Sequence, residues 1–190
     1  MDIVKLLTNQ LNSPDTLKKL AGSVGVESSQ AQKLTQLGIP AILQALGRNA
    51  STKEGAEALL GALDGHQKDE IEDLTGFLNK VDTNDGAKIL QHIFSGNNKR
   101  VQENLARQTG LNTSQVSGIM TQLAPLMMGA LGKKKKEENL DVSGVVGLLG
   151  GLMDGGDNNL MGIVTNLLDS DNDGDVMDNI GDLLGGLFKK

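Results

Sequence analysis

The chain contains no cysteine, tryptophan or tyrosine, and phenylalanine stands at only three of its 190 positions. Without cysteine it can form no disulfide, no thiolate zinc site and no cysteine nucleophile, so packing alone must hold its core. With so few aromatic rings it lacks the usual surfaces on which bases, sugars or flat cofactors stack. The core must therefore consist of aliphatic side chains.

Long apolar runs are also missing. No segment is apolar and free of charge over the roughly 18 residues that a membrane-spanning helix needs, and the N-terminus lacks the apolar stretch of a signal peptide. We therefore expect a cytoplasmic protein. Its length suffices for an apolar core, whether it forms one domain or two small ones.

Acidic residues are concentrated at the C-terminus. From residue 140 onward the sequence contains nine aspartates, and its only basic residues are Lys189 and Lys190, so this part carries a net charge of −7. Because the whole chain carries −6, residues 1–139 sum to +1. The acidity therefore belongs to the C-terminal segment, while the rest of the chain is nearly neutral.

Apolar residues recur at helical spacing along nearly the whole chain, and alternating β-branched runs are absent, so the pattern predicts an all-α fold. Ser13 and Pro14 are typical of an N-cap followed by proline at the first helical position. Gly47 and Gly132 each follow a leucine and precede a basic residue, a pattern typical of a left-handed C-terminal cap. Two helix ends are therefore predicted at these glycines.

An internal repeat appears when the chain is laid over itself with a shift of 85 residues. LAGSVGVESSQAQKLTQLGIPAILQALG at residues 20–47 then matches LARQTGLNTSQVSGIMTQLAPLMMGALG at residues 105–132 without a gap. Each copy has a proline at the same position, Pro40 and Pro125, which should kink or break its helix. The sequence therefore predicts two related helical units.

Each unit is predicted to contain four helices, of which the second ends at a glycine and the third carries the proline. The first unit covers residues 1–66, a connecting helix covers residues 67–81, and the second unit covers residues 82–155. An acidic loop-helix tail follows at residues 156–190. Within the second unit the sequence KKKKEEN, at residues 133–139, is predicted to be a solvated polar linker.

Both copies of the repeat match the helix-turn-helix pattern, with Gly25 and Gly110 at the turns. DNA binding is therefore the alternative function, and Lys99, Arg100 and Arg107 would supply cations for the phosphates. Acidic residues offset these charges, and the second helix of each copy runs into an apolar proline segment. The sequence therefore favours helices that meet at a glycine corner over helices that bind nucleic acid.

Signals for catalysis are weak. His66 and His92 have no acid, cysteine or second histidine at ligand spacing, which argues against a zinc site and a histidine-dependent nucleophile. No phosphate-binding glycine loop is present, and no Asp or Glu pair has an evidently apolar setting. We therefore predict a non-enzymatic protein and assign no catalytic residue.

Glycines recur along one side of the segment VSGVVGLLGGLMDGG, at Gly144, Gly147, Gly151 and Gly155. A flat stripe of this kind permits close helix contact, so the Gly/Leu-rich C-terminal helices predict self-association, a protein partner or contact with a membrane surface. Packing inside the second unit is the simpler explanation, because GALDG stands in the equivalent place of the first unit.

The stretch DSDNDGDVMD, at residues 169–178, follows the first half of an EF-hand calcium loop. Aspartates stand at loop positions one, three and five, glycine allows the sharp turn at six, and the residue at seven can offer its backbone carbonyl. Hard oxygen ligands at alternating positions suit Ca²⁺. The candidate metal ligands are Asp169, Asp171, Asp173, Asp175 and Asp178.

The loop departs from the EF-hand pattern at position twelve, where Ile180 stands in place of the bidentate glutamate. Asp178 is the nearest carboxylate that could substitute, although it is equally suited to cap the following helix. Loss of the twelfth ligand predicts weak binding, with a dissociation constant of about 10⁻⁴ to 10⁻³ M. An acidic capped turn without metal is the alternative interpretation.

LGIPAILQALGRN, LAPLMMGALGKK, the LLGGL segments and the terminal LDSDNDGDVMDNIGDLLGGLF together resemble the bacterial DUF937 family, a family of unknown function. The resemblance extends over nearly the whole chain. It implies a helical bacterial protein, often with an aspartate-rich loop before a final Gly/Leu helix, and it implies no activity. Together these patterns predict an interaction or scaffolding protein whose expected cofactor is Ca²⁺.

Overall fold

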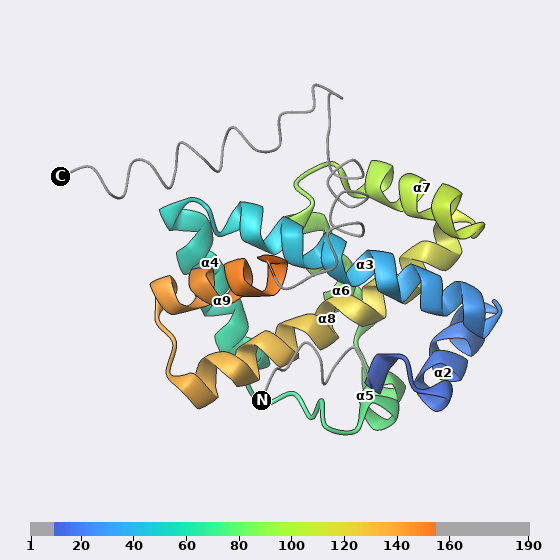
Figure 1. Cartoon of the computed structure of the whole chain (residues 1–190), viewed down its shortest axis with the longest axis horizontal. Helices are drawn as coiled ribbons and strands as arrows, with labels where there is room; N and C mark the ends of the chain where they lie inside the picture. Colours follow the sequence, from blue (N-terminus) through green and yellow to red (C-terminus); the bar gives the residue numbers. More distant parts are fainter. Residues whose placement is uncertain (1–9, 155–190) are drawn as a thin grey trace.

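The computed structural model describes residues 10–154, and every regular element within that range is an α-helix. The predicted all-α fold is therefore confirmed. Helix labels follow Figure 1 and begin with α2. The helices are α2 (Pro14–Val24), α3 (Ser28–Asn49), α4 (Lys53–His66), α5 (Leu74–Lys80), α6 (Thr83–Ile93), α7 (Asn98–Thr109), α8 (Thr113–Glu138) and α9 (Val142–Asp154).

The boundaries of α2 and α7 follow local sequence signals. At the start of α2 the Thr16 N–H donates to Ser13 Oγ at 3.4 Å, and Pro14 takes the first helical position, as predicted. α2 ends at Gly25 with φ 67°, and α7 ends at Gly110 with φ 74°. Other residues are strained in this left-handed conformation, so the two glycines form the corners that lead into α3 and α8.

Gly47 and Gly132 do not cap helices, so that prediction was wrong. α3 runs on to Asn49 and α8 to Glu138, and both glycines lie inside a helix. At Gly132 a Cβ atom would lie 2.6 Å from the Leu63 backbone oxygen. Glycine is needed there because α4 approaches α8 closely, and the helix does not end at this position.

Both long helices continue through a proline. Pro40 lies inside α3 and Pro125 inside α8, each within one uninterrupted helical segment. A proline inside a helix removes a backbone hydrogen bond and costs about 3 kcal/mol. The neighbouring residues Ile39, Ala41 and Leu126 are buried, and their packing offsets that cost. A break at the proline is therefore absent from both helices.

α8 is the central helix of the described residues, and it packs against α2, α3, α4, α6 and α7. Figure 1 shows α4 and α9 at one end of the molecule and α2, α5 and α7 at the other. α6 lies very close to α8, because a Cβ atom on Gly86 would be 1.8 Å from the Thr121 backbone oxygen. α4 also packs on α8, whereas α9 packs on α3, so these contacts tie the two halves of the chain together.

Apart from Phe94, the described core is aliphatic, as the composition predicts. Buried side chains from all eight described helices form one continuous cluster. Burial of one such side chain contributes about 1.5–3 kcal/mol, so the cluster supplies the main stabilisation of a chain without disulfides. Its largest fully buried members are Leu11, Leu20, Leu34, Ile42, Leu46, Leu63, Leu90, Leu105, Ile119, Met120, Leu123 and Leu126.

The connecting helix predicted at residues 67–81 is only partly formed. α5 makes up its last part, and residues 67–73 are irregular. Asp73 caps α5 with its side chain, which favours a helix start at that point. Before it, Ile71 turns into the core, where it is 5% exposed and lies against Gly129 of α8. The irregular segment 67–73 therefore contributes a core residue that packs against α8.

Candidate functional site

The five predicted calcium ligands lie outside the described residues. This applies to Asp169, Asp171, Asp173, Asp175 and Asp178, so the calcium site stays a prediction. Within residues 10–154, no group of three or more histidine or acidic side chains is arranged to hold a metal ion. The polar groups that the structure does bring together lie near the ends of α4, α6 and α8.

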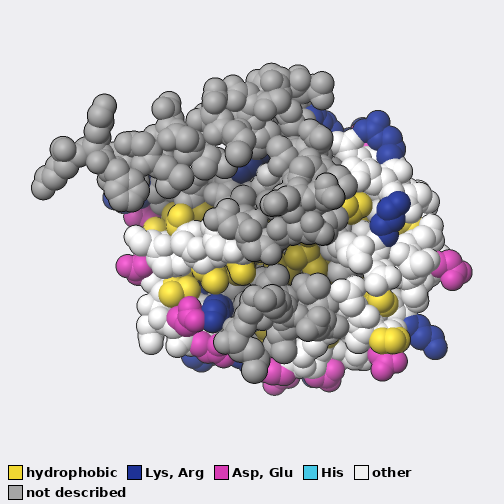
Figure 2. Space-filling view, in the orientation of Figure 1, with side chains coloured by type: hydrophobic (Ala, Val, Ile, Leu, Met, Phe, Trp, Pro, Cys, Tyr) yellow, Lys and Arg dark blue, Asp and Glu magenta, His cyan; other side chains and the backbone are white. Residues whose placement is uncertain are grey.

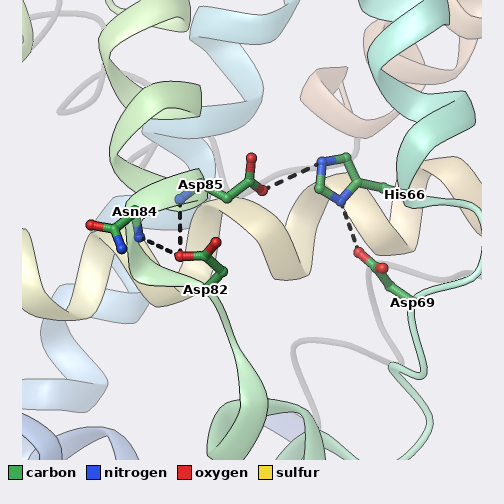
Figure 3. A network of polar contacts seen from close by, with 5 residues as sticks. All are labelled: His66, Asp69, Asp82, Asn84 and Asp85. Atoms are coloured by element: carbon green, nitrogen blue, oxygen red, sulfur yellow. Dashed lines mark hydrogen bonds and ion pairs between the residues drawn. The ribbon is translucent and has the colours of Figure 1, made fainter.

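His66 lies between two carboxylates, a cluster that the sequence did not predict (Figure 3). Its Nδ1 lies 2.8 Å from Asp69 Oδ2, and its Nε2 lies 3.7 Å from Asp85 Oδ2. The prediction that this histidine has no nearby acid was therefore wrong. Asp69 stands three residues further along the chain, a spacing that could have revealed it, whereas Asp85 comes from a different helix.

Local structure fixes each member of this cluster. His66 is the last residue of α4, and Asp69 lies in the turn that follows, where its N–H donates to the His66 carbonyl at 3.2 Å. Asp85 lies in the first turn of α6. Asp82 caps that helix by accepting from the N–H groups of Asn84 and Asp85 at 2.8 and 3.4 Å. Acids suit the start of a helix and histidine suits its end, so both helix termini are stabilised.

The pair formed by His66 and Asp69 has the arrangement of a general base with its orienting carboxylate. In a nucleophilic site the second ring nitrogen faces a hydroxyl or thiol, whereas here it faces the carboxylate of Asp85. The ring forms a hydrogen bond with Asp69, whereas Asp85 lies at the longer distance of an electrostatic contact. We therefore interpret the cluster as a set of polar contacts that holds the end of α4 to the start of α6.

The four consecutive lysines belong to α8, so the solvated linker predicted at residues 133–139 was wrong. Lysine and glutamate are good helix formers, and positive charge is favoured in the last turn of a helix. Lys135 is 9% exposed and contacts Asp64 of α4, while Lys133 contacts Glu72 in the segment before α5. These ion pairs hold the end of α8 against its neighbours.

The two helix-turn-helix segments differ in what they expose. At the start of α3 the side chains of Ser28 and Lys33 are exposed. In α8, Gly118 lies against α2, and Gln122 Nε2 donates to Ser23 Oγ of α2 at 2.8 Å. The start of the second helix is open in both copies, since Thr113 and Ser114 of α8 are exposed like Ser28 of α3. The copies differ at matching positions further on, where Lys33 is exposed and Gly118 lies against α2.

Basic side chains lie at the end of the molecule that carries α7, and acidic side chains follow the lower edge of the same face (Figure 2). Among the cations that DNA binding would use, Lys99 forms an ion pair with Glu103 at 3.9 Å, and Arg107 donates to Asn104. Exposed pairs of this kind contribute about 0–1 kcal/mol. Both cations therefore have partners within α7.

Within the described part of the chain, α9 packs by one side. Val145 and Leu149 are buried, and the helix lies against α3 and α4, which belong to the first predicted unit. On the other side Val146 is 41% exposed, and a Cβ atom on Gly147 or Gly151 would meet no described atom within 4 Å. Packing within residues 10–154 therefore does not explain these glycines. No helix in that range has the length and apolarity to cross a bilayer.

Comparison with protein families matches residues 5–134 to DUF937, described as a bacterial protein of unknown function. The matched range contains α2 to α7 and most of α8. No curated protein and no solved structure matches the chain. The resemblance that the repeated proline segments indicated is therefore confirmed.

Proposed function

The chain belongs to the DUF937 family of bacterial proteins of unknown function, and from its own residues we propose that it is a non-enzymatic interaction protein with a calcium-binding C-terminal loop. The observation that carries the interaction part is α9, which is buried on one side and meets no described residue at Gly147 and Gly151 on the other. The calcium part rests on the aspartate spacing at residues 169–178.

An internal duplication is part of this proposal, with residues 20–47 and 105–132 as its two copies. Matching helix starts support it: the N–H of Glu27 donates to Gln30 Oε1 at 3.3 Å, and that of Asn112 donates to Gln115 Oε1 at 3.0 Å.

Crosswise packing supports the duplication as well. α2 and α4 lie on α8, whereas α7 and α9 lie on α3. Such reciprocal contacts are typical of two equivalent units related by a twofold axis. The helical body would then be a fused pair of units, followed by the acidic tail at residues 156–190.

The open side of α9 supports a helical partner. Glycine in a helix costs about 1 kcal/mol relative to alanine, so Gly147 and Gly151 weaken α9 without gaining a close contact to another described residue. A second helix would gain from them, because glycine lets two backbones approach closely. Val146 would add apolar contact, and Figure 2 shows apolar side chains over the region of α9.

We take a second copy of the chain as the partner. Analytical sedimentation that shows only monomer, with and without Ca²⁺, would contradict this.

Calcium would act on the segment that follows α9. Clustered carboxylates repel one another, and Ca²⁺ would neutralise them and order the final Gly/Leu segment. That segment would then present an apolar side to the body or to the partner. The apolar residues concerned are Leu183, Leu184, Leu187 and Phe188.

Calorimetric titration of the full chain with Ca²⁺ tests the loop. We expect one saturable site with Kd of about 10⁻⁴ to 10⁻³ M. The double variant Asp171→Asn and Asp173→Asn should abolish the heat. The matched variant Asp154→Asn and Asp157→Asn removes the same charge outside the loop and should leave the heat unchanged. Absence of heat from the unaltered chain, or equal loss in both variants, would exclude the site.

DNA binding through the corner between α2 and α3 is the second candidate, because Ser28 and Lys33 are exposed there. It would use the α3 copy of the repeat, since α2 covers the α8 copy from Gly118 onward. A gel shift that weakens with salt and is lost on Lys33→Glu would favour this candidate, and its absence at low salt would exclude it.

A further inference from the structure

We propose that residues 3–9 of the chain dock on the side of α3 that carries Gln36 and Pro40, as α6 docks on α8. This inference rests on the internal duplication proposed above. It starts from a difference between the two copies, because residues 119–132 of α8 are all buried, whereas the matching stretch of α3 exposes Gln36 and leaves Pro40 half-buried. One side of α3 is therefore less covered than the matching side of α8.

On α8 this side is covered by α6. A Cβ atom on Gly86 would lie 1.8 Å from the Thr121 backbone oxygen, and the buried Pro125 lies one turn further along the same side. At the shift of 85 residues, these two positions of α8 correspond to Gln36 and Pro40 of α3. A counterpart of α6 on α3 would therefore lie over the two less covered positions.

The helices around α3 and α8 otherwise occur as matching pairs. α2 and α4 pack on α8, and their counterparts α7 and α9 pack on α3. α6 packs on α8, but a counterpart of α6 on α3 is missing among the described helices. Because α6 directly precedes α7, the corresponding segment is the one that directly precedes α2.

The residues before α2 resemble those of α6. DIVKLLTNQL at residues 2–11 matches DGAKILQHIF at residues 85–94 without a gap, and three positions are identical. Residues 3–9 lie outside the described range, but the end of the segment, residues 10–11, is described and is helical. In both cases a backbone hydrogen bond closes a turn before the next helix, at 3.1 Å before α2 and at 2.8 Å before α7.

Apolar residues at intervals of four give the segment one side to bury. In α6 this spacing joins the buried residues Gly86, Leu90 and Phe94. Leu11, the counterpart of Phe94, is 0% exposed. The spacing therefore predicts one apolar side for a helix in this segment. The counterparts on that side are Ile3, Leu7 and Leu11.

The contact on α3 would be wider than the contact on α8. Ile3 stands where α6 has Gly86, so the two backbones cannot approach each other as closely as those of α6 and α8. The Ile3 side chain would instead lie over the half-buried ring of Pro40. Removal of both apolar surfaces from water favours the docking.

The short connection to α2 favours docking within the same chain. Only Asn12 and Ser13 separate Leu11 from the start of α2, and α2 itself packs on α3. A short link gives the segment a high effective concentration at α3, which the segment of a second copy would have to exceed. We therefore take the chain's own residues 3–9 as the occupant of this side of α3.

Paramagnetic labelling of the full ¹⁵N-labelled chain tests the docking. The chain has no cysteine, so Lys33→Cys carries a nitroxide at one position, one turn before Gln36 and outside the contact. We expect broadened amide signals for residues 3–9 and for α7, which packs on α3. The same label at the exposed Lys53, beyond the far end of α3, should broaden residues 3–9 much less.

The pattern of broadening separates the possible failures. Broadening of α7 without residues 3–9 would overturn the docking alone, whereas broadening of neither would contradict the crosswise packing as well. A mixture of ¹⁵N-labelled chain without cysteine and unlabelled chain with the nitroxide should leave residues 3–9 sharp. Broadening in that mixture would show docking on a second copy and overturn docking within one chain. None of these signals comes from residues 169–188, so the calcium-binding proposal is tested separately.

Two matched variants test the apolar side. Leu7→Ser changes the counterpart of the buried Leu90, so it should remove the broadening of residues 3–9 and lower the thermal midpoint by about 5 °C. Lys5→Ser changes the counterpart of the exposed Lys88 and should leave both the broadening and the midpoint as they are. Equal behaviour of the two variants would overturn the proposal.

Discussion

α3 and α8 carry matching sequences around a proline, yet they end differently. After the shared Ala-Leu-Gly, α3 reaches only Asn49, whereas α8 runs on to Glu138. RNAST follows in the first case, and its Thr52 caps the next helix. KKKKEE follows in the second, and its lysines are helix formers that find carboxylates on neighbouring segments. The repeated residues determine what the two helices share, and the residues after them determine where each helix ends.

The two helices also differ in how far they are enclosed. Residues 119–132 of α8 are all buried, whereas the matching stretch 34–47 of α3 exposes Gln36 and leaves Pro40 half-buried. Where the two helices meet, α3 provides Gly38, and a Cβ atom there would lie 2.6 Å from Met120 Sδ of α8. At this contact α3 therefore contributes the small residue, Gly38, and α8 contributes the bulky residue, Met120. Substitutions that press on α8 should therefore have the larger effects.

The largest effect is expected at Gly86 of α6. In Gly86→Ala the new methyl group would overlap the Thr121 backbone oxygen of α8, which cannot rotate away, so we expect a loss of about 3 kcal/mol in unfolding free energy. Gly61→Ala is the control, because its Cβ would meet no described atom and it should gain up to about 1 kcal/mol. Urea denaturation measures both. Equal stability of the two variants would show that α6 and α8 are not in close contact.

A medium effect is expected at the extended end of α8. Lys135→Ala removes a mostly buried side chain and its contact with Asp64, so we expect a loss of about 1–2 kcal/mol. Lys136→Ala is a matched control at the next position, where the side chain is exposed, and it should stay within about 0.5 kcal/mol of the unaltered chain. Thermal and urea denaturation measure the difference. Similar values for both would mean that the ion pair does not hold this end.

The smallest effect compares the starts of the two helices. Asn112 Oδ1 accepts from the Gln115 N–H at 2.9 Å, so Asn112→Ala should cost about 1 kcal/mol. Glu27→Ala should cost less, about 0.5 kcal/mol, because glutamate is not among the preferred N-cap residues. Urea denaturation measures the difference between the two losses, as a difference in midpoints at equal m-values. The reverse order would contradict the view that α8 is the more firmly built copy.

The sequence predicted those features of the fold that depend on neighbouring residues. The cap formed by Ser13 and Pro14 and the corners at Gly25 and Gly110 all depend on contacts within one turn of chain. The failures depend on distant partners. Gly132 was taken for a cap because its neighbours resemble one, whereas its role is to admit α4.

The candidate sites divide in the same way. The calcium loop could be proposed because its ligands would lie within ten residues of chain. The contact between His66 and Asp85 could not, because Asp85 reaches His66 from another helix. Residues of this kind carry no spacing signal, since their proximity is created by the tertiary fold.

An NMR titration of the full ¹⁵N-labelled chain with Ca²⁺ tests the central claim most directly. If the loop binds calcium and controls the segment after it, the amides of residues 169–188 should shift and saturate at millimolar Ca²⁺, while the core of α8 stays unchanged. Mg²⁺ at the same concentration should have a smaller effect, because it loses its water reluctantly. Unchanged spectra in residues 169–188 at saturating Ca²⁺ would contradict the proposed function.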